Sequence, residues 1–220
     1  MKKLEFITTG NEILSGLTVD TNFSWAAERF SLSGLIPSYH VSVSDDAEDI
    51  INAYKMAAGR SAFVIVTGGL GPTSDDLTVE TSAKFFGTGL FFDKGSYDSI
   101  EDKLKQRGRT ILEIHRKQAM FPEGSEIIKN DIGTSNGYKY IFDGCSFYFL
   151  PGVPREFKSM INGFVLPDII KTSGSGKHVV QKIIKTIGLG ESEVAERLNG
   201  LEFKGCDFSY RINLARCVRF

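Results

Sequence analysis

The sequence predicts an α/β protein with three layers, α/β/α, built on a mostly parallel sheet and followed by a small α+β domain. Runs of β-forming residues alternate with amphipathic segments that begin at capping residues, which is typical of parallel βαβ units. One run, residues 62–66, is nearly all apolar, as expected for a strand covered on both faces. The composition, 41% hydrophobic and 24% charged over 220 residues, is that of an ordinary globular protein.

The first part of the chain is predicted to contain three strand–helix pairs. Strands are expected at residues 4–9, 36–43 and 62–66, and helices at 23–32, 47–58 and 77–86. Polar residues suited to helix N-caps precede the first two helices, in Asp20-Thr21-Asn22 and Ser44-Asp45-Asp46.

Further along, we expect helices at 97–106, 113–120 and 154–161. Strands at 138–142 and 146–150 are joined through Asp143-Gly144, which indicates a hairpin. The polar, glycine-rich segment 171–177 is typical of a linker. We therefore expect a domain at 1–170 and a small domain at 178–220, with a strand at 178–187, a helix at 192–201 and one or two strands in 207–220. These last strands are short, so we expect the small domain to be incomplete.

Charge and cysteine content favour a small-molecule partner. A formal net charge of -1 indicates neither a nucleic-acid nor a membrane-surface partner. Cys145, Cys206 and Cys217 are too widely spaced for a zinc site or a disulfide framework, and we expect them to be reduced. No apolar run reaches membrane-spanning length, and the N-terminal run is too short for a secretory signal. We expect a cytoplasmic protein.

The segment TGGLGPTSDD, residues 67–76, leaves the third predicted strand and opens a helix. Ligands bind at this place in open α/β sheets, and a helix N-terminus favours phosphate. Glycines allow close backbone approach, so the segment predicts a phosphate cradle, although it matches neither common phosphate-loop pattern. The residues of this cradle are Gly68, Gly69, Gly71, Thr73 and Ser74.

Asp75 and Asp76 in this segment have two interpretations. One carboxylate caps the following helix. Alternatively, the pair binds a divalent cation that also contacts phosphate. Such a cation commonly uses one or two carboxylates as ligands. Glu12 and Asp46 follow the first two strands, and parallel strands bring their carboxyl ends to one edge. We therefore expect Glu12, Asp46 and Asp76 in one neighbourhood, although each alone also fits a cap or a solvated loop.

Five segments, taken in order, resemble the CinA (competence/damage-inducible protein) family. They are GNEILSGLTVDTN (10–22), VSDDAEDI (43–50), TGGLGPTSDDLT (67–78), RKQAMFPEG (116–124) and LPGVPREFKSM (150–160). The N-terminal part of CinA proteins shares the molybdopterin-binding fold of MoaB, MogA and the gephyrin E domain. IGLGESEVAERL (187–198) is similar to the small domain that follows in CinA proteins.

The resemblance implies a nucleotide or pterin phosphate ligand and a divalent metal (magnesium, manganese or cobalt). It implies that Asp46 and Asp76 are functional carboxylates; a double Asp, here Asp75 with Asp76, is usual in CinA-like chains. Other residues in the matching motifs are expected to contact the ligand: Gly10, Asn11, Thr78, Pro151 and Gly152. Arg116 and Lys117 either neutralise a phosphate or lie on a solvated helix face.

The sequence departs from the family pattern at two places. His115 stands where Asn is common, and residues 133–137, GTSNG, replace GTAPG. Full-length CinA proteins also carry a nicotinamide mononucleotide amidohydrolase domain, and we expect no such activity in a chain that stops at Phe220.

The leading hypothesis is metal-dependent hydrolysis of a nucleotide pyrophosphate such as ADP-ribose, giving AMP and ribose 5-phosphate. Asp76, Asp75 and Asp46 are then catalytic, and Asp76, Asp46 and Glu12 bind the metal. One alternative is a molybdopterin-binding or adenylyl-transferring protein of molybdenum cofactor biosynthesis. Another is a nucleotide sensor without catalysis. Dimers and trimers both occur on this fold, so we expect a homo-oligomer.

Overall fold

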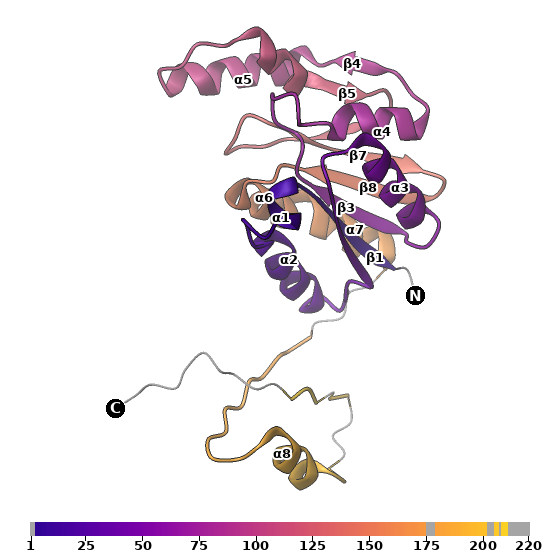
Figure 1. Cartoon of the computed structure of the whole chain (residues 1–220), viewed down its shortest axis with the longest axis vertical. Coiled ribbons are helices and arrows are strands. Elements are labelled where there is room, and N and C mark those ends of the chain that lie inside the picture. The colour runs from indigo at the N-terminus through magenta and orange to yellow at the C-terminus, as the bar shows by residue number, and fades with distance from the viewer. Residues whose placement is uncertain (1–2, 175–178, 202–204, 207, 211–220) are drawn as a thin grey trace. The chain divides into compact units, whose positions relative to one another are not determined.

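The computed structural model of the chain describes residues 3–174, 179–201, 205–206 and 208–210. They belong to two compact units, Met1–Val180 and Gln181–Phe220. The division lies shortly after segment 171–177. The first unit contains the sheet and most of the helices (Figure 1).

A six-stranded sheet forms the centre of the first unit. Its order is β2 (Tyr39–Val43), β1 (Leu4–Thr9), β3 (Phe63–Thr67), β8 (Cys145–Leu150), β7 (Gly137–Phe142) and β6 (Glu126–Ile128). The first four strands are parallel, and β7 is antiparallel to both of its neighbours. The predicted three-layer α/β/α class and the β7–β8 hairpin are confirmed. The second strand is shorter than expected, and β6 was not predicted.

Helices cover both faces of this sheet (Figure 1). One face packs against α2 (Thr21–Ser31), α6 (Pro154–Met160) and α7 (Leu166–Ser173), with a π-helical turn, Ile161–Val165, between the last two. The other face packs against α3 (Ala47–Ala58) and α4 (Thr78–Phe86). Side chains alternate along β1, so Phe6 belongs to one apolar layer and Ile7 to the other.

Asp20 and Asp46 are the N-caps of α2 and α3, as the capping pattern predicted. The Asp20 carboxylate accepts from the Phe23 N–H, and the Asp46 carboxylate accepts from the N–H groups of Glu48 and Asp49. A short helix, α1 (Asn11–Leu14), was not predicted. The expected linker was placed too early, because residues 171–173 complete the last turn of α7 before Gly174 ends it in a left-handed conformation.

An insertion between α4 and β6 forms a cap at one end of the first unit (Figure 1). It contains β4 (Leu90–Phe92), α5 (Lys94–Gln106), a 3-10 helix η1 (Glu113–Ala119) and β5 (Met120–Pro122). We expected an α-helix over 113–120. The structure has a 3-10 helix instead, and it ends at Ala119 because Met120 is extended and pairs with Phe92 in a small antiparallel sheet.

In the second unit, the described residues contain one helix, α8 (Glu191–Leu198), close to the helix expected at 192–201. The strand expected at 178–187, which spans the division between the two units, is absent from described residues 179–187; Val180, Ile183 and Ile187 are exposed there, and they pair with no strand among the described residues. Residues 208–210 form no strand, and 207 and 211–220 lie outside the described residues. None of the described helices combines the length and apolar character needed to cross a membrane.

Glu5 is a fully buried carboxylate on the central strand β1. Arg60 holds it with two hydrogen bonds, Nη2–Oε1 at 2.5 Å and Nε–Oε2 at 3.1 Å, and the Ser61 hydroxyl donates to Oε2 at 2.7 Å. The Arg60 guanidinium also lies over the ring of Tyr39, 4.0 Å from its centroid. Glu5 is therefore neutralised by a single cation at the amino-terminal ends of the strands.

Replacing Arg60 with leucine is expected to lower the free energy of unfolding by about 3 kcal/mol, because Glu5 stays buried without its partner. Urea unfolding followed by circular dichroism measures the change. The control is Lys94→Leu, which breaks the exposed pair with Asp98 and costs less than about 1 kcal/mol. Equal effects of the two substitutions would contradict the role given to Arg60.

Candidate functional site

A cavity of about 530 Å³ lies at the carboxyl ends of β1, β3 and β8. The strands are in register there, with Thr8 opposite Thr67 and Thr67 opposite Leu150. Their following loops form the walls, as expected where parallel strands end. The lining residues come from the α1 segment, the glycine-rich loop after β3, the 134–135 loop and the start of α6.

The glycine-rich loop passes very close to its neighbours. Gly68 has φ of 107°, and a Cβ on it would lie 2.5 Å from the Thr9 carbonyl oxygen. The Gly68 N–H donates to the Leu150 carbonyl at 3.1 Å. Gly69 also has a positive φ, 65°, and a Cβ there would collide with the Thr78 hydroxyl. These glycines are required by packing within the chain, and the Gly68 N–H is already occupied.

Thr73 and Asp76 form a turn within this loop. The Asp76 Oδ2 atom accepts from the Thr73 N–H at 2.9 Å and from the Thr73 hydroxyl. A side chain on Gly71 would collide with the Asp76 carboxylate. The pKa of Asp75 is lowered by hydrogen bonding from the Thr73 side chain, by hydrogen bonding from the backbone of Asp75 itself, and by the charge of Lys117. Both Asp75 and Asp76 line the cavity; Asp75 is exposed and Asp76 is half-buried.

The structure brings together some of the carboxylates predicted for the site and leaves one out. Glu12 lines the cavity with Asp75 and Asp76. Asp46 does not, because its carboxylate caps α3. Its neighbour Asp45 lines the cavity instead, and Asp45 Oδ2 accepts from the Asn11 N–H at 2.9 Å.

Among the other predicted contacts, the six glycine and proline positions line the cavity: Gly10, Gly68, Gly69, Gly71, Pro151 and Gly152. Six do not: Asn11, Thr73, Ser74, Thr78, Arg116 and Lys117.

These six residues mostly make contacts within the protein. The Thr78 hydroxyl donates to the Gly68 carbonyl at 2.9 Å. Lys117 donates to the Thr73 carbonyl at 3.1 Å and pairs with Glu80 at 3.3 Å. Arg116 lies over the Phe92 ring, 4.2 Å from its centroid. Thr78 and Lys117 therefore hold the glycine-rich loop in place from outside the cavity.

His115 also acts within the chain. Its Nδ1 atom accepts from the Leu112 N–H at 2.9 Å at the start of η1. His115 is not among the residues that line the cavity.

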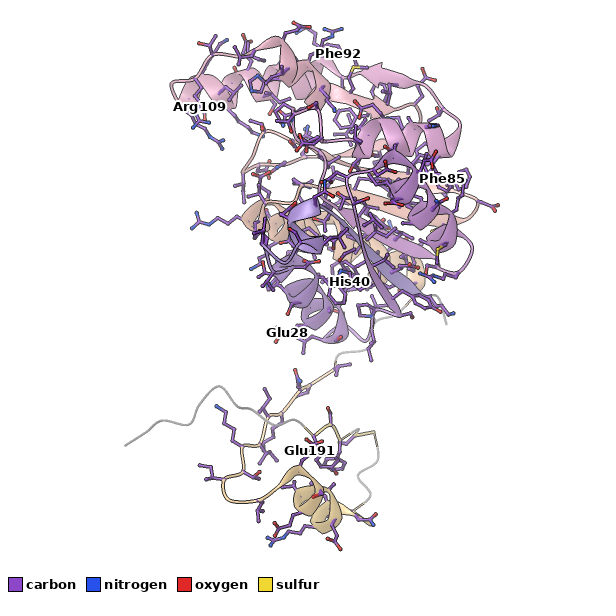
Figure 2. All side chains as sticks on the ribbon, in the orientation of Figure 1. Glu28, His40, Phe85, Phe92, Arg109 and Glu191 are labelled. Atoms are coloured by element: carbon purple, nitrogen blue, oxygen red, sulfur yellow. The ribbon has the colours of Figure 1, made fainter. Side chains whose placement is uncertain are left out.

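Asp20 is a cavity residue that we had considered only as a helix cap. Its Oδ2 atom accepts from the Thr8 hydroxyl at 2.6 Å and lies 3.1 Å from His40 Nε2. His40 stacks on Phe23, with 3.7 Å between ring centroids, and Figure 2 shows the position of His40 in the first unit. Burial alone would raise the pKa of Asp20, but hydrogen bonds from His40, the Phe23 N–H and Thr8 outweigh it and lower the pKa to about 2.

The sequence also did not indicate that several other polar residues line the cavity, among them Asn22, Gln118 and Glu156. Asn22 and Gln118 are 7% and 6% exposed. Glu156 passes over Gly133, where a Cβ would collide with its carboxylate, and accepts from the buried Asn130 side chain at 2.7 Å. Capping and glycine patterns carry no information about such residues, although Asn22 and Gln118 fall within the family motifs.

The cavity has a strongly acidic lining. Among the described residues, no Lys, Arg or His lines it. Six carboxylates do: Glu12, Asp20, Asp45, Asp75, Asp76 and Glu156. No three Asp, Glu, His or Cys side chains in the described part of the chain are grouped to hold a metal ion. This donor set still fits magnesium-type cations, which commonly use one or two carboxylates together with phosphate oxygens and water.

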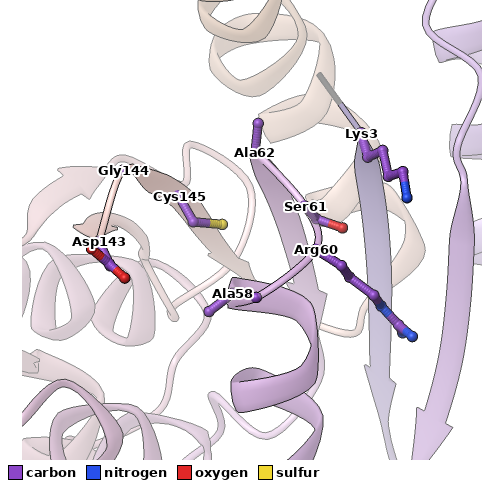
Figure 3. Close-up of a pocket in the computed structure, with 9 residues that line it drawn as sticks. Lys3, Ala58, Arg60, Ser61, Ala62, Asp143, Gly144 and Cys145 are labelled. Atoms are coloured by element: carbon purple, nitrogen blue, oxygen red, sulfur yellow. The ribbon is translucent and has the colours of Figure 1, made fainter. Parts of the chain in front are cut away.

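A second hollow, of about 340 Å³, lies at the opposite, amino-terminal ends of the strands (Figure 3). Its Arg60 is held by Glu5, and Cys145 is a buried free thiol whose pKa burial raises to about 12. These groups are engaged or unreactive, so the carboxyl-end cavity is the candidate ligand site.

Fold and cavity together define an α/β domain with a candidate ligand site at the carboxyl ends of its parallel strands. The model of the family described as "probable molybdopterin binding domain" matches residues 5–171. MoaB of Thermus thermophilus shares the fold, with a TM-score of 0.53 and 16% identity over 80% of this chain and 98% of that one.

Relatives with higher sequence identity show which family with this fold the chain belongs to. A competence-damage inducible protein of Oceanobacillus iheyensis is 38% identical over 90% of this chain and 47% of its own length. A CinA-like protein of Escherichia coli is 35% identical over 97% of this chain and 54% of its own length. The crystal structure of CinA from Thermoplasma acidophilum, whose function is given as unknown, has a TM-score of 0.69 and 34% identity over 76% of this chain and 97% of that one. The chain belongs to the CinA family, and it spans about half the length of these curated relatives.

Gly68→Ala is expected to lower the free energy of unfolding by at least about 2 kcal/mol, because the substitution combines a positive φ with a collision against Thr9. Gly163→Ala is the control, since nothing lies within 4 Å of a Cβ there. That control is expected to be neutral or stabilising by up to about 1 kcal/mol. Chemical denaturation of both variants measures the difference, and similar stabilities would refute the packing explanation.

Asp20 should contribute to stability above pH 3.8, and this contribution should be lost as the pH falls toward about 2, because its folded pKa lies below the ordinary value of 3.8. Asp20→Asn retains a good N-cap but removes the charge. The thermal midpoint of the wild type should exceed that of the variant at pH 5, and the gap should shrink by pH 2.5. A gap that is independent of pH would contradict this assignment.

Proposed function

We propose that the chain hydrolyses the pyrophosphate bond of a nucleotide such as ADP-ribose in the presence of magnesium, manganese or cobalt. The acidic lining of the cavity is the observation that supports this most directly. Phosphate groups are repelled by ionised carboxylates unless a cation lies between them. The family match supports a phosphate-bearing nucleotide or pterin as the ligand.

Asp76 and Asp75 are the proposed metal-binding carboxylates, with Glu12 as a third donor on the same cavity. A bound divalent cation would neutralise phosphate charge and lower the pKa of a water molecule. Asp75, which is exposed and has a lowered pKa, is ionised at neutral pH and suited to orient that water. Thr73 fixes Asp76 through two hydrogen bonds, and Lys117 holds the Thr73 carbonyl, so the loop presents both carboxylates in a defined position.

Asp45 takes the place that the sequence had suggested for Asp46. Both follow β2, but Asp45 lines the cavity and Asp46 caps α3. The reciprocal contacts between Asn11 and Asp45 keep this acid beside the α1 segment that carries Glu12. We therefore assign the second-strand carboxylate of the proposed reaction to Asp45.

The second candidate function is binding or adenylylation of molybdopterin. It is favoured by the family description and by the shared fold of MoaB, and the same cavity would serve. A third candidate function is that of a sensor, which would bind a nucleotide in the same cavity without hydrolysing it. We also propose that the chain acts as a dimer or trimer.

The test is AMP release from ADP-ribose by the purified protein with magnesium, manganese or cobalt. Asp76→Asn is expected to lower the rate by at least about 100-fold, because it removes a negative charge that would hold the catalytic cation. Asp46→Asn is the matched control: it should stay within about 3-fold of the wild type, since Asn caps a helix as well as Asp does.

Full activity of Asp76→Asn would remove the proposed hydrolytic role of this loop. No AMP release from the wild type with any of the three metals, combined with tight molybdopterin binding, would favour the second candidate. A loss of activity in Asp46→Asn with normal folding would return the catalytic role to Asp46.

A further inference from the structure

Two buried amide oxygens in the cavity wall lack hydrogen-bond partners among the described residues. They are Asn22 Oδ1 and Gln118 Oε1, on side chains that are 7% and 6% exposed. Both residues line the cavity. A buried polar atom without a partner is destabilising, so two such atoms on residues that line one cavity indicate that something else supplies the missing hydrogen bonds.

The amide nitrogen of Asn22 is held by the protein. Its Nδ2 atom donates to the Gly152 carbonyl at 2.7 Å and lies 3.5 Å from the Thr67 hydroxyl. These contacts fix which end of the amide is the donor, because the Gly152 carbonyl only accepts. The free atom is therefore the oxygen, at the carboxyl ends of β3 and β8.

Gln118 is held in the same way on another wall. Its Nε2 atom donates to the Ser135 hydroxyl and, at 3.3 Å, to the Thr134 hydroxyl. The Ser135 hydroxyl donates in turn to the Leu70 carbonyl at 2.9 Å, which orients it to accept from Gln118. Gln118 belongs to η1, so the cap contributes this acceptor to the cavity.

We infer that Asn22 and Gln118 recognise the hydroxyl groups of a ribose, and that they determine specificity for a ribose-bearing ligand. This inference deepens the proposed function by naming the part of the substrate that these residues bind. A carbonyl oxygen only accepts hydrogen bonds, so its partner must carry O–H or N–H groups. Ionised phosphate carries neither, and therefore belongs at the glycine-rich loop with the cation.

The chemistry of the lining favours a sugar as the source of these donors. The cavity is lined by six carboxylates as well as by Asn22 and Gln118, and three of its threonine hydroxyls donate within the protein: Thr8 to Asp20, Thr9 to the Thr67 carbonyl, and Thr67 to the Pro151 carbonyl. The wall is thus rich in acceptors. Sugar hydroxyls supply several donors close together without adding negative charge.

The experiment removes a protein side chain and a ligand hydroxyl, separately and together, and compares the effects on the dissociation constant. Dissociation constants are measured by calorimetry with magnesium for AMP, 2′-deoxy-AMP, 3′-deoxy-AMP, ribose 5-phosphate and 2-deoxyribose 5-phosphate. None contains a pyrophosphate, so binding is measured without turnover. The proteins are wild type, Gln118→Met, Gln118→Glu and Asn22→Leu, each checked for an unchanged circular dichroism spectrum.

In the wild type, removing the recognised hydroxyl should weaken binding by about 10-fold or more, since a buried acceptor is left unpaired. In Gln118→Met or Asn22→Leu, the ribose probe should bind more weakly than to the wild type, and the ratio of the deoxy and ribose dissociation constants should fall below about 3-fold. Gln118→Glu retains an acceptor, and the Thr134 hydroxyl is able to donate to it, so this variant should keep the preference for ribose.

Equal binding of ribose and deoxy probes to the wild type would overturn the inference, as would an unchanged ribose preference in both Gln118→Met and Asn22→Leu. Absence of binding by AMP and by ribose 5-phosphate would also overturn it. The proposed hydrolysis fails separately: a protein that shows the ribose preference but releases no AMP from ADP-ribose binds nucleotides without hydrolysing them.

Discussion

The close contact between the Gly68 backbone and the Thr9 carbonyl is the constraint on which the cavity depends. β1 and β3 are adjacent and in register, so the chain leaving β3 must turn directly beside the end of β1. Only a residue without a Cβ fits there, and Gly68 also donates its N–H to β8 through Leu150. One residue therefore ties three strand ends together, and the walls of the cavity are built outward from that point.

The same constraint changes how the glycine-rich loop is interpreted. The sequence suggested that its glycines admit a phosphate. In the structure, Gly68 and Gly69 are required by neighbouring atoms of the protein, and Gly71 makes room for the Asp76 carboxylate. The loop is best understood as a rigid support for two acids. Thr78 and Lys117, which the family resemblance suggested as ligand contacts, provide that support from behind.

Much of the fold was predictable because it follows from local signals. Apolar strands, capping residues and the Asp143-Gly144 turn located β1, β3, α3, β7 and β8 closely. Features set by distant partners were not predictable: Met120 becomes a strand residue only because Phe92 pairs with it, and residues 179–187 have strand-forming side chains but pair with no strand among the described residues.

In the candidate site, too, features set by local sequence were predictable and features set by distant contacts were not. Two adjacent acids follow β2, and which one faces the cavity depends on where α3 begins. Since Asp46 directs its carboxylate to the N–H groups of α3, Asp45 is left for the cavity. Asn22 and Gln118 belong to no spacing rule, and their unpaired oxygens become visible only when the surrounding hydrogen bonds are known.

The topology of the sheet also has a consequence for the order in which the protein is assembled during synthesis. β8 pairs with β3, yet Phe63 and its partner Ser146 are separated by α4, the whole cap and β7. Bringing such distant segments together carries a loop-closure entropy that local contacts do not. Pro151, Gly152 and Glu156 follow β8, so a nascent chain that ends before them has the glycine-rich loop and its acids but lacks one wall of the cavity. The complete cavity is therefore formed only in chains that have been synthesised past Glu156 in α6.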